Sequence, residues 1–208
     1  MLDKHIVPIL KPPLAQAASV LHGRGWIADR VTVAGFVIGL FCVLALALGE
    51  PLLGLLLLLL NRLADGIDGE LARKQTPTDA GGFLDISLDF IFYALFPLGF
   101  AVANPVDNAL PAAALIASFV GTGASFLAFS SMAGKYKLEH PEFGYKGFYY
   151  LDGLAEGTET ILFFSLMCLF PNHFALLAWV FSAICVVTAL NRVWFGYLTL
   201  KRDTRHES

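Results

Sequence analysis

Four aspartates lie between two apolar segments of the chain, and this placement constrains the fold more than any other feature. The apolar segments span residues 52–60 and 90–102, and the aspartates are Asp65, Asp68, Asp85 and Asp89. A carboxylate at membrane depth costs at least ~2.5 kcal/mol, so acids that are kept there mark a functional site. Four acids that nearby Lys or Arg cannot neutralise predict bound cations. We therefore interpret the chain as a metal-dependent enzyme that acts on a charged headgroup at a membrane surface.

The composition indicates an all-α, polytopic integral membrane protein. Of the 208 residues, 57% are apolar or aromatic and only 15% are charged, against about 25% in an ordinary soluble domain. Three cysteines lie scattered in apolar runs without metal-binding spacing, and we interpret them as reduced packing residues: Cys42, Cys168 and Cys185. No nucleic-acid partner is expected.

Stretches of about 20 mostly apolar residues predict six transmembrane helices. Their expected ranges are 31–49, 51–73, 80–103, 109–133, 151–170 and 173–199. The segment before them alternates apolar and polar residues, which favours an interfacial amphipathic helix; a loosely packed leader is the alternative. The predicted organisation is an N-terminal cytoplasmic or interfacial segment, a six-helix transmembrane catalytic domain and a cytoplasmic tail, at residues 1–30, 31–200 and 201–208.

The distribution of Lys and Arg predicts the orientation. These residues occur in both terminal segments and in the connections near residues 74 and 140, whereas the three opposite connections have none. By the positive-inside rule, both termini and the aspartates face the cytoplasm. The first 30 residues lack the apolar core of a cleavable signal peptide, and the compact length favours a bacterial inner membrane.

The spacing of the acids predicts one shared site. Asp65 and Asp68 are three residues apart, and Asp85 and Asp89 are four apart, so each pair shares a helix face. Because the connection is short, we expect the two helices to be antiparallel neighbours that point all four carboxylates into one cavity. Hard oxygen ligands suit Mg²⁺, Mn²⁺ or Ca²⁺, and four acids suffice for two ions. The alternative is that the acids cap helix ends or pair with basic neighbours, namely Arg62, Arg73 and Lys74.

The same residues resemble the motif of a known family. They fit D-x2-D-G-x2-A-R followed by G-x3-D-x3-D, as Asp65, Asp68, Gly69, Ala72, Arg73, Gly81, Asp85 and Asp89. Seven residues separate Arg73 from Gly81, where eight are usual, and Gly82 follows directly. Together with the six-span plan, this long motif makes most of the chain similar to the CDP-alcohol phosphatidyltransferases.

This resemblance implies an enzyme of phospholipid biosynthesis. It implies transfer of a phosphatidyl group from a CDP-linked lipid, of the CDP-diacylglycerol type, to the hydroxyl of an alcohol, with release of CMP. It also implies Mg²⁺ or Mn²⁺, as two ions, and a homodimer. Asp89 would be the general base in contact with metal, and the other metal ligands would be Asp65, Asp68 and Asp85. The CDP-lipid would contact Thr32, Asp65, Asp68, Gly69, Ala72, Arg73, Gly81 and Asp85.

Basic residues near the later spans are candidates for the acceptor alcohol. Arg192 lies within the last predicted span, and Lys135 and Lys137 follow the fourth. For Arg192, a salt bridge to Glu156, Glu159 or Asp89 is the alternative. For the lysines, the alternative is the ordinary cytoplasmic excess of positive charge.

Two other functions are compatible with intramembrane acids. An intramembrane prenyltransferase also binds a diphosphate through Mg²⁺ and aspartates, but a second acidic motif is not evident after residue 90. A non-enzymatic cation transporter would be expected to show internal repeats, and the aspartate pattern is not repeated.

Overall fold

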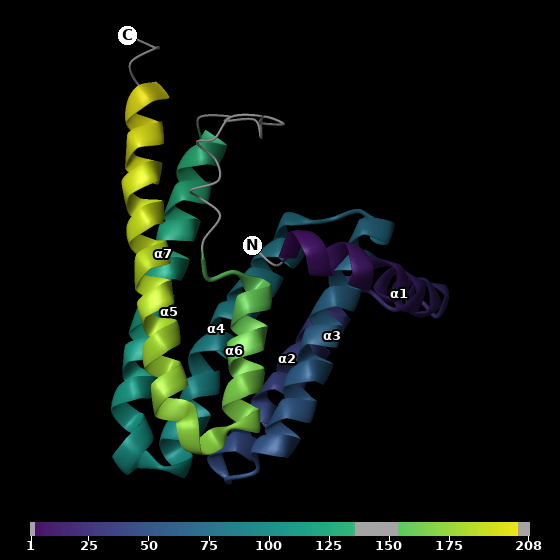
Figure 1. Ribbon diagram of the computed structural model, residues 1–208. Coiled ribbons are helices and arrows are strands. Elements are labelled where there is room, and N and C mark those ends of the chain that lie inside the picture. Colours follow the sequence, from purple (N-terminus) through teal and green to yellow (C-terminus); the bar gives the residue numbers. More distant parts are fainter. Residues whose placement is uncertain (1–2, 136–153, 204–208) are drawn as a thin grey trace.

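The computed structural model describes residues 3–135 and 154–203, and this part of the chain is helical apart from short connections. Helices α2 to α7 run side by side as a bundle, and α1 lies across one end of it (Figure 1). The helices are α1 (Asp3–Gly23), α2 (Ala28–Ala47), α3 (Pro51–Gln75), α4 (Asp79–Ala103), α5 (Pro105–Lys135), α6 (Gly157–Leu169) and α7 (Phe174–Asp203), with a 3-10 turn at Pro171–His173 before α7. The predicted all-α membrane fold is confirmed.

Four of the described helices, α2, α4, α5 and α7, are long and apolar enough to cross a membrane. The six bundle helices, α2 to α7, lie at about the positions of the six predicted spans. Because only four of them meet this measure of length and apolarity, the predicted count of six spans is approximate. Helix α3 is long enough but carries acidic and basic residues along its second half. Helix α6 begins at Gly157, later than predicted, and its 13 residues extend about 20 Å, less than the hydrocarbon thickness of about 30 Å.

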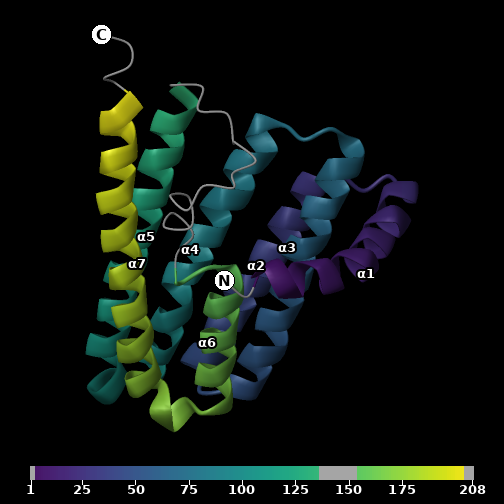
Figure 2. The same cartoon turned by 45° about the horizontal axis from the view of Figure 1, so that its top comes forward.

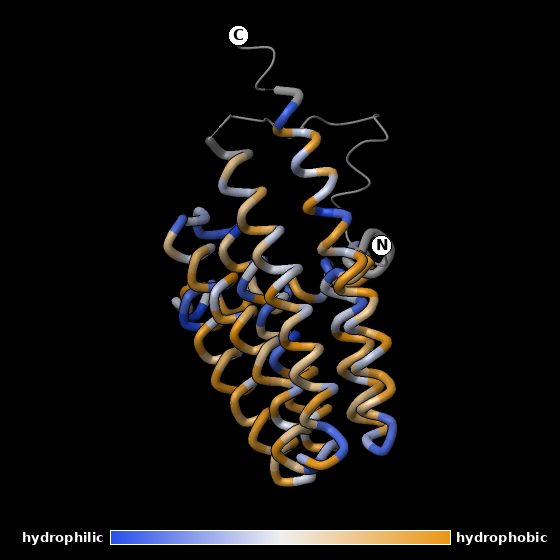
Figure 3. The backbone as a smooth tube through the Cα atoms, turned by 90° about the vertical axis from the view of Figure 1, so that its left-hand side faces the viewer, coloured by the Kyte–Doolittle hydropathy of each residue, from blue (hydrophilic) through white to orange (hydrophobic). Residues whose placement is uncertain are grey.

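Apolar residues cover most of the length of the bundle, and polar residues gather toward the helix ends (Figure 3). Many large apolar side chains are exposed on the outside of the bundle, including Phe41, Leu52, Leu190 and Trp194. Such exposure is what a lipid-facing surface requires, because lipid tails are as apolar as these side chains. The chain is an integral membrane protein.

Helix α1 packs on the bundle at the end where the connection between α3 and α4 also lies (Figure 2). Ala18 on α1 forms a buried cluster with Val31 of α2 and Leu71 of α3. Leu14 lies so close to Gly66 that a Cβ on Gly66 would be 2.8 Å from a Leu14 methyl carbon. Ile9, Leu10 and Val20 remain exposed. An amphipathic helix packed on α3 contradicts a loosely packed leader, and its location at the membrane interface stays a prediction.

Phenylalanines from α4, α5, α6 and α7 form the centre of the core. Phe96 of α4 stacks on Phe164 of α6 with 3.8 Å between ring centroids, and Phe100 of α4 stacks on Phe174 of α7 at 4.5 Å. All four rings are nearly or fully buried, and offset aromatic pairs add roughly 0.5–1.5 kcal/mol beyond burial alone. The three cysteines are buried and free, as predicted. The short helix α6 is therefore held in the bundle mainly by apolar packing.

Glycines let α2 approach both α3 and α4. A Cβ on Gly35 would lie 2.9 Å from Cβ of Ala64, and a Cβ on Gly39 would lie 2.8 Å from the Phe92 ring. On α4, a Cβ on Gly99 would lie 2.9 Å from Cβ of Leu46. Because α2 packs against both helices while the backbones of α3 and α4 come close to each other at few positions, the expectation that α3 and α4 pack directly on each other is wrong; they meet through polar side chains. Helix α2 lies against both, which leaves room for polar side chains between α3 and α4.

We predict that Gly99→Ala destabilises the bundle. The added Cβ would lie 2.9 Å from Cβ of Leu46 and 3.0 Å from the carbonyl oxygen of Val43, neither of which can rotate away, so α2 and α4 must separate. Overpacking of this kind costs about 1–3 kcal/mol, against a gain of up to ~1 kcal/mol in helix propensity. Gly82→Ala is the control, because nothing lies within 4 Å of its added Cβ. Thermal unfolding in detergent should show a lower melting temperature only for Gly99→Ala; equal values would contradict the close approach.

Candidate active site

All four aspartates of the motif line one narrow cavity between α2, α3 and α4. The cavity has a volume of about 10 Å³, roughly enough for one water-sized species. Helix α3 contributes Asp65 and Asp68, and α4 contributes Asp85 and Asp89. The prediction that the helical spacing points four carboxylates into one cavity is confirmed.

Three of these carboxylates converge. One oxygen from each of Asp65, Asp68 and Asp85 lies within 4.8 Å of the other two. Asp68 is 4% exposed, and Asp65 and Asp85 are half-buried. Carboxylate oxygens at this separation are the donors that a hard divalent cation prefers, and like charges so close together repel unless a cation lies between them. This donor set fits Mg²⁺ or Mn²⁺.

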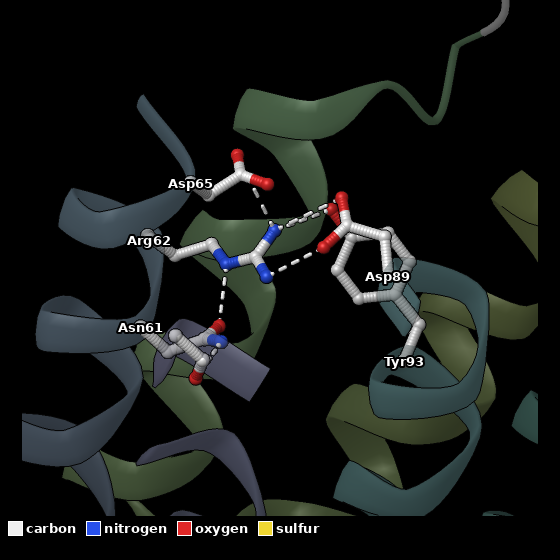
Figure 4. A network of polar contacts seen from close by, with 6 residues as sticks. Asn61, Arg62, Asp65, Asp89 and Tyr93 are labelled. Atoms are coloured by element: carbon white, nitrogen blue, oxygen red, sulfur yellow. Dashed lines mark hydrogen bonds and ion pairs between the residues drawn. The ribbon is translucent and has the colours of Figure 1, made fainter. Parts of the chain in front are cut away.

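The fourth carboxylate, Asp89, is held by Arg62 instead (Figure 4). Arg62 Nη2 lies 2.8 Å from Asp89 Oδ1, and Arg62 Nη1 donates to Asp89 Oδ2 at 3.4 Å and to the Tyr93 hydroxyl at 2.9 Å. Arg62 Nη1 also lies 3.8 Å from Asp65. The alternative in which a basic neighbour pairs with an acid is thus confirmed for Asp89 and, by a longer ion pair, for Asp65. The expected contact of Asp89 with metal stays a prediction.

A second cavity of about 360 Å³ adjoins the carboxylates on the side of the α3–α4 connection. Thr32, Asp68 and Asp85 line both cavities. The wider cavity is lined mainly by small side chains and by backbone: Gly69, Ala72, Gly81 and Gly82, together with residues of the turns before α2 and α4. Most residues expected to contact a nucleotide therefore surround one space next to the acids.

The two glycines at the start of α4 differ in their surroundings. Thr78 directly precedes α4 and caps it, because its hydroxyl accepts a hydrogen bond from the Gly81 backbone N–H at 3.0 Å. A Cβ on Gly81 would lie 3.0 Å from a carboxylate oxygen of Asp29 and 3.1 Å from that hydroxyl, whereas Gly82 has open space around it. Gly81 is thus the position where absence of a side chain matters, despite the shorter connection from Arg73.

Arg73 pairs with an acid of its own helix. Its Nη2 lies 2.6 Å from an oxygen of Glu70, three residues earlier. The guanidinium lies beside Gly69, because a Cβ there would be 3.6 Å from Nη2. Arg73 was expected to support a nucleotide or to pair with an acid; the structure shows the pair with Glu70, and the nucleotide contact stays a prediction. Glu70, which lies outside the motif, was not predicted to take part.

Gln75, the last residue of α3, is a site residue that sequence reasoning missed. Its side-chain oxygen accepts from the Ala28 backbone N–H at 3.2 Å, and its side-chain nitrogen donates to the Trp26 carbonyl oxygen at 2.6 Å. Gln75 also lines the wider cavity. It ties the turn between α1 and α2 to α3, so one rim of the cavity depends on it. A polar residue at a helix end gives no sequence signal for such a partner.

Arg192 lines a third cavity of about 440 Å³ between α4, α5, α6 and α7. Its Nη1 donates to the Thr122 carbonyl oxygen at 3.4 Å, and its guanidinium lies 5.6 Å from the centre of the Phe126 ring. Tyr93 and Glu156 line the same cavity. The other two residues expected to contact the acceptor cannot be placed beside it: Lys137 is outside the described residues, and Lys135 ends α5 with a side chain that is not described.

Comparisons with known proteins agree with this architecture. A family model for CDP-alcohol phosphatidyltransferase matches residues 26–190. The inner membrane protein YnjF of Escherichia coli (strain K12) is 55% identical over 201 residues, which cover 97% of this chain and 98% of that protein. Archaetidylinositol phosphate synthase of Pyrococcus horikoshii is 31% identical over 121 residues, or 58% of this chain and 64% of that protein.

A solved structure shares the fold. The crystal structure of phosphatidylinositol phosphate synthase from Mycobacterium tuberculosis, with CDP-DAG bound, superposes with a TM-score of 0.64 at 18% identity, covering 88% of this chain and 93% of that one. Fold and site together define an integral membrane enzyme. The chain belongs to the CDP-alcohol phosphatidyltransferase family, which confirms the resemblance and leaves no support for the prenyltransferase and transporter alternatives.

We predict that Gln75→Ala loosens the rim of the wider cavity. The substitution removes two hydrogen bonds, each worth about 0.5–1.5 kcal/mol, that hold the turn containing Arg24 on α3. It also removes a 3.4 Å contact with His22 at the end of α1. Limited trypsin digestion should therefore cut after the exposed Arg24 faster than in the unsubstituted protein. Gln16→Ala, an exposed glutamine on α1, is the control. Equal cleavage rates would show that the turn is held by other contacts.

Proposed function

We propose that this enzyme transfers a phosphatidyl group from CDP-diacylglycerol, or a closely similar CDP-linked lipid, to the hydroxyl of an alcohol and releases CMP. The observation that carries the proposal is the junction of two spaces: three convergent carboxylates and an adjoining cavity lined by small residues. A CDP-linked lipid would place the negative charge of its diphosphate at the three carboxylates and the flat ring of its cytidine in the adjoining cavity. Membership of the family and the CDP-DAG in the similarly folded synthase support this assignment.

Asp65, Asp68 and Asp85 are the residues that would hold the divalent ions. A Mg²⁺ or Mn²⁺ ion bound there would neutralise the diphosphate and stabilise the charge that develops on the leaving CMP. In this proposal Asp89 would help to hold a second ion beside the cluster of three, as the resemblance implies. The proximity of Thr32, which lines both cavities, gives the donor lipid a hydroxyl to contact at the boundary between diphosphate and nucleoside.

Asp89 acts as the general base in this proposal. One of its oxygens accepts the proton of the acceptor hydroxyl while the hydroxyl oxygen forms a bond to the phosphorus of the phosphatidyl group. The bond from that phosphorus to the CMP oxygen breaks, and CMP leaves with the electron pair. Asp89 is suited to this role because it is apart from the three convergent acids and its side chain is still 29% exposed.

The cavity at Arg192 is the proposed acceptor site. It is separated from the aspartates by Tyr93, whose hydroxyl contacts Arg62. Arg192 offers a guanidinium to a phosphate or carboxylate of the acceptor, and Lys135 and Lys137 remain candidates for the same role. We further propose a bacterial inner membrane protein with its active site toward the cytoplasm, consistent with the Lys and Arg distribution and with the inner membrane relative, and we expect a homodimer.

The proposed function predicts CMP release by the purified protein from CDP-diacylglycerol in the presence of Mg²⁺ and one alcohol from a panel. Asp68→Asn and Asp89→Asn should each lower the rate about 100-fold or more, as loss of a charge-stabilising or proton-accepting group does. Asp107→Asn, at an exposed position at the start of α5, is the control and should retain the full rate. Near-normal rates in both active-site variants would remove the motif as the active site.

The metal assignment predicts a separate effect of Asp85→Asn. Loss of one carboxylate from the cluster should raise the half-saturating Mn²⁺ concentration about 10-fold or more, while the protein stays folded because an acid has been removed from a site of mutual repulsion. Mn²⁺ binding followed by electron paramagnetic resonance measures this without turnover. Asp107→Asn serves again as the control, and unchanged Mn²⁺ affinity in Asp85→Asn would contradict the assignment.

A further inference from the structure

We propose that Arg62 is a positioning residue for the transfer reaction, which acts by fixing the carboxylate of Asp89. Arg62 is outside the eight matching motif residues, and the inference rests on the proposed function, because it assigns to Arg62 the orientation of the proposed base. The geometry that supports it is the set of contacts around a single guanidinium.

The Arg62 guanidinium is held from several sides. Its side chain is 8% exposed. Its Nε donates to the side-chain oxygen of Asn61 at 2.7 Å, and its Nη1 donates to the Tyr93 hydroxyl at 2.9 Å. The rings of Phe92 and Tyr93 lie 5.3 and 5.2 Å from it, within the range of a cation–π interaction. A guanidinium with so many partners has little freedom to turn.

Asn61 connects this guanidinium to a third helix. Its side-chain nitrogen donates to the Gly35 carbonyl oxygen of α2 at 2.8 Å, so its side-chain oxygen is directed at Arg62. Asn61 is itself 3% exposed. A continuous series of hydrogen bonds therefore runs from the α2 backbone through Asn61 and Arg62 of α3 to Asp89 and Tyr93 of α4 (Figure 4). The position of Asp89 is set by all three helices.

The contacts of the two terminal nitrogens of Arg62 also determine which lone pairs of Asp89 remain available. Each carboxylate oxygen has two lone-pair sites, and Arg62 takes one on each oxygen, at 2.8 Å from Oδ1 and 3.4 Å from Oδ2. The Tyr93 hydroxyl, which accepts from Arg62 Nη1, also hydrogen-bonds Asp89. These contacts hold the Asp89 carboxylate in one orientation and leave it lone pairs with which to accept the proton of the acceptor hydroxyl.

Arg62→Lys tests this inference directly, beside the wild-type enzyme and the control Arg24→Lys at an exposed position in the α1–α2 turn. Lysine keeps the positive charge but cannot contact both Asp89 oxygens, Asn61 and Tyr93 from one planar group. We expect kcat for CMP release to fall about 10- to 100-fold, as misplacement of a reacting group by about 1 Å does. The KM for CDP-diacylglycerol should stay within about twofold, since the lost contacts orient the proposed base and do not touch the donor lipid.

Tyr93→Phe is a second variant that keeps the core filled. It removes only the hydroxyl, which receives Arg62 Nη1 and also contacts Asp89, so the ring packing against Phe164 and Phe119 is kept. We expect kcat to fall about 3- to 10-fold, the equivalent of one hydrogen bond, with the KM for CDP-diacylglycerol again unchanged. This variant decides the question if Arg62→Lys does not fold.

Two results would overturn the role of Arg62. One is an unchanged kcat in Arg62→Lys, or in Tyr93→Phe where the lysine variant is unfolded. The other is a parallel deterioration of kcat, KM and melting temperature, which indicates a general loosening of the fold. A wild-type enzyme that releases no CMP with any alcohol gives a different result, because it refutes the proposed function itself and this inference with it.

Discussion

The ion pair between Arg62 and Asp89 is the interaction on which the rest of this site depends. Four carboxylates line one narrow cavity inside a membrane bundle, and a buried charge without a partner is strongly destabilising. Arg62 forms a close ion pair with Asp89, at 2.8 Å, and a longer one with Asp65, at 3.8 Å. The remaining negative charge is concentrated on three oxygens within 4.8 Å of one another. One cation supplied by the chain therefore divides the acids into a member that is closely paired with Arg62 and a cluster of three, where we propose that divalent cations bind.

Helix α2 makes this division possible because it packs against both α3 and α4. Its glycines Gly35 and Gly39 allow contacts that a Cβ would prevent, and the Gly35 carbonyl oxygen orients Asn61. One turn earlier, Thr32 lies at the boundary of the narrow and the wide cavity. The same face of α2 thus sets the distance between α3 and α4, orients the partner of Arg62 and contributes to the site itself. Its small residues have a functional consequence as well as a packing one.

The sequence was sufficient to predict the membrane fold and the convergence of the aspartates, because both follow from periodicity within single helices. Asp65 and Asp68 share a face whatever surrounds them, and so do Asp85 and Asp89. Contacts between helices were less predictable. The short α3–α4 connection suggested direct neighbours, but the space between them contains the polar site and α2 bridges them. Arg62 was a possible partner by charge, yet its choice of Asp89 over Asp65 depends on how α4 is placed. Gln75 had no sequence signal, because its partners are backbone atoms of a distant turn.

The arrangement of the three cavities bears on how the proposed transfer can proceed. The wide cavity, on the donor side, contacts the acids through Asp68 and Asp85, whereas the cavity at Arg192 approaches them through Tyr93. Arg62 and Asp89 lie between these two approaches, since Arg62 contacts both Asp89 and Tyr93. Under the proposed function, donor and acceptor would reach Asp89 from different sides. Displacement at phosphorus requires the attacking and leaving oxygens to be roughly in line, and approach from different sides is compatible with that requirement. The residues that separate the two approaches, Arg62 and Tyr93, are the same ones that orient the proposed base, so alignment of the substrates and orientation of Asp89 depend on one set of contacts.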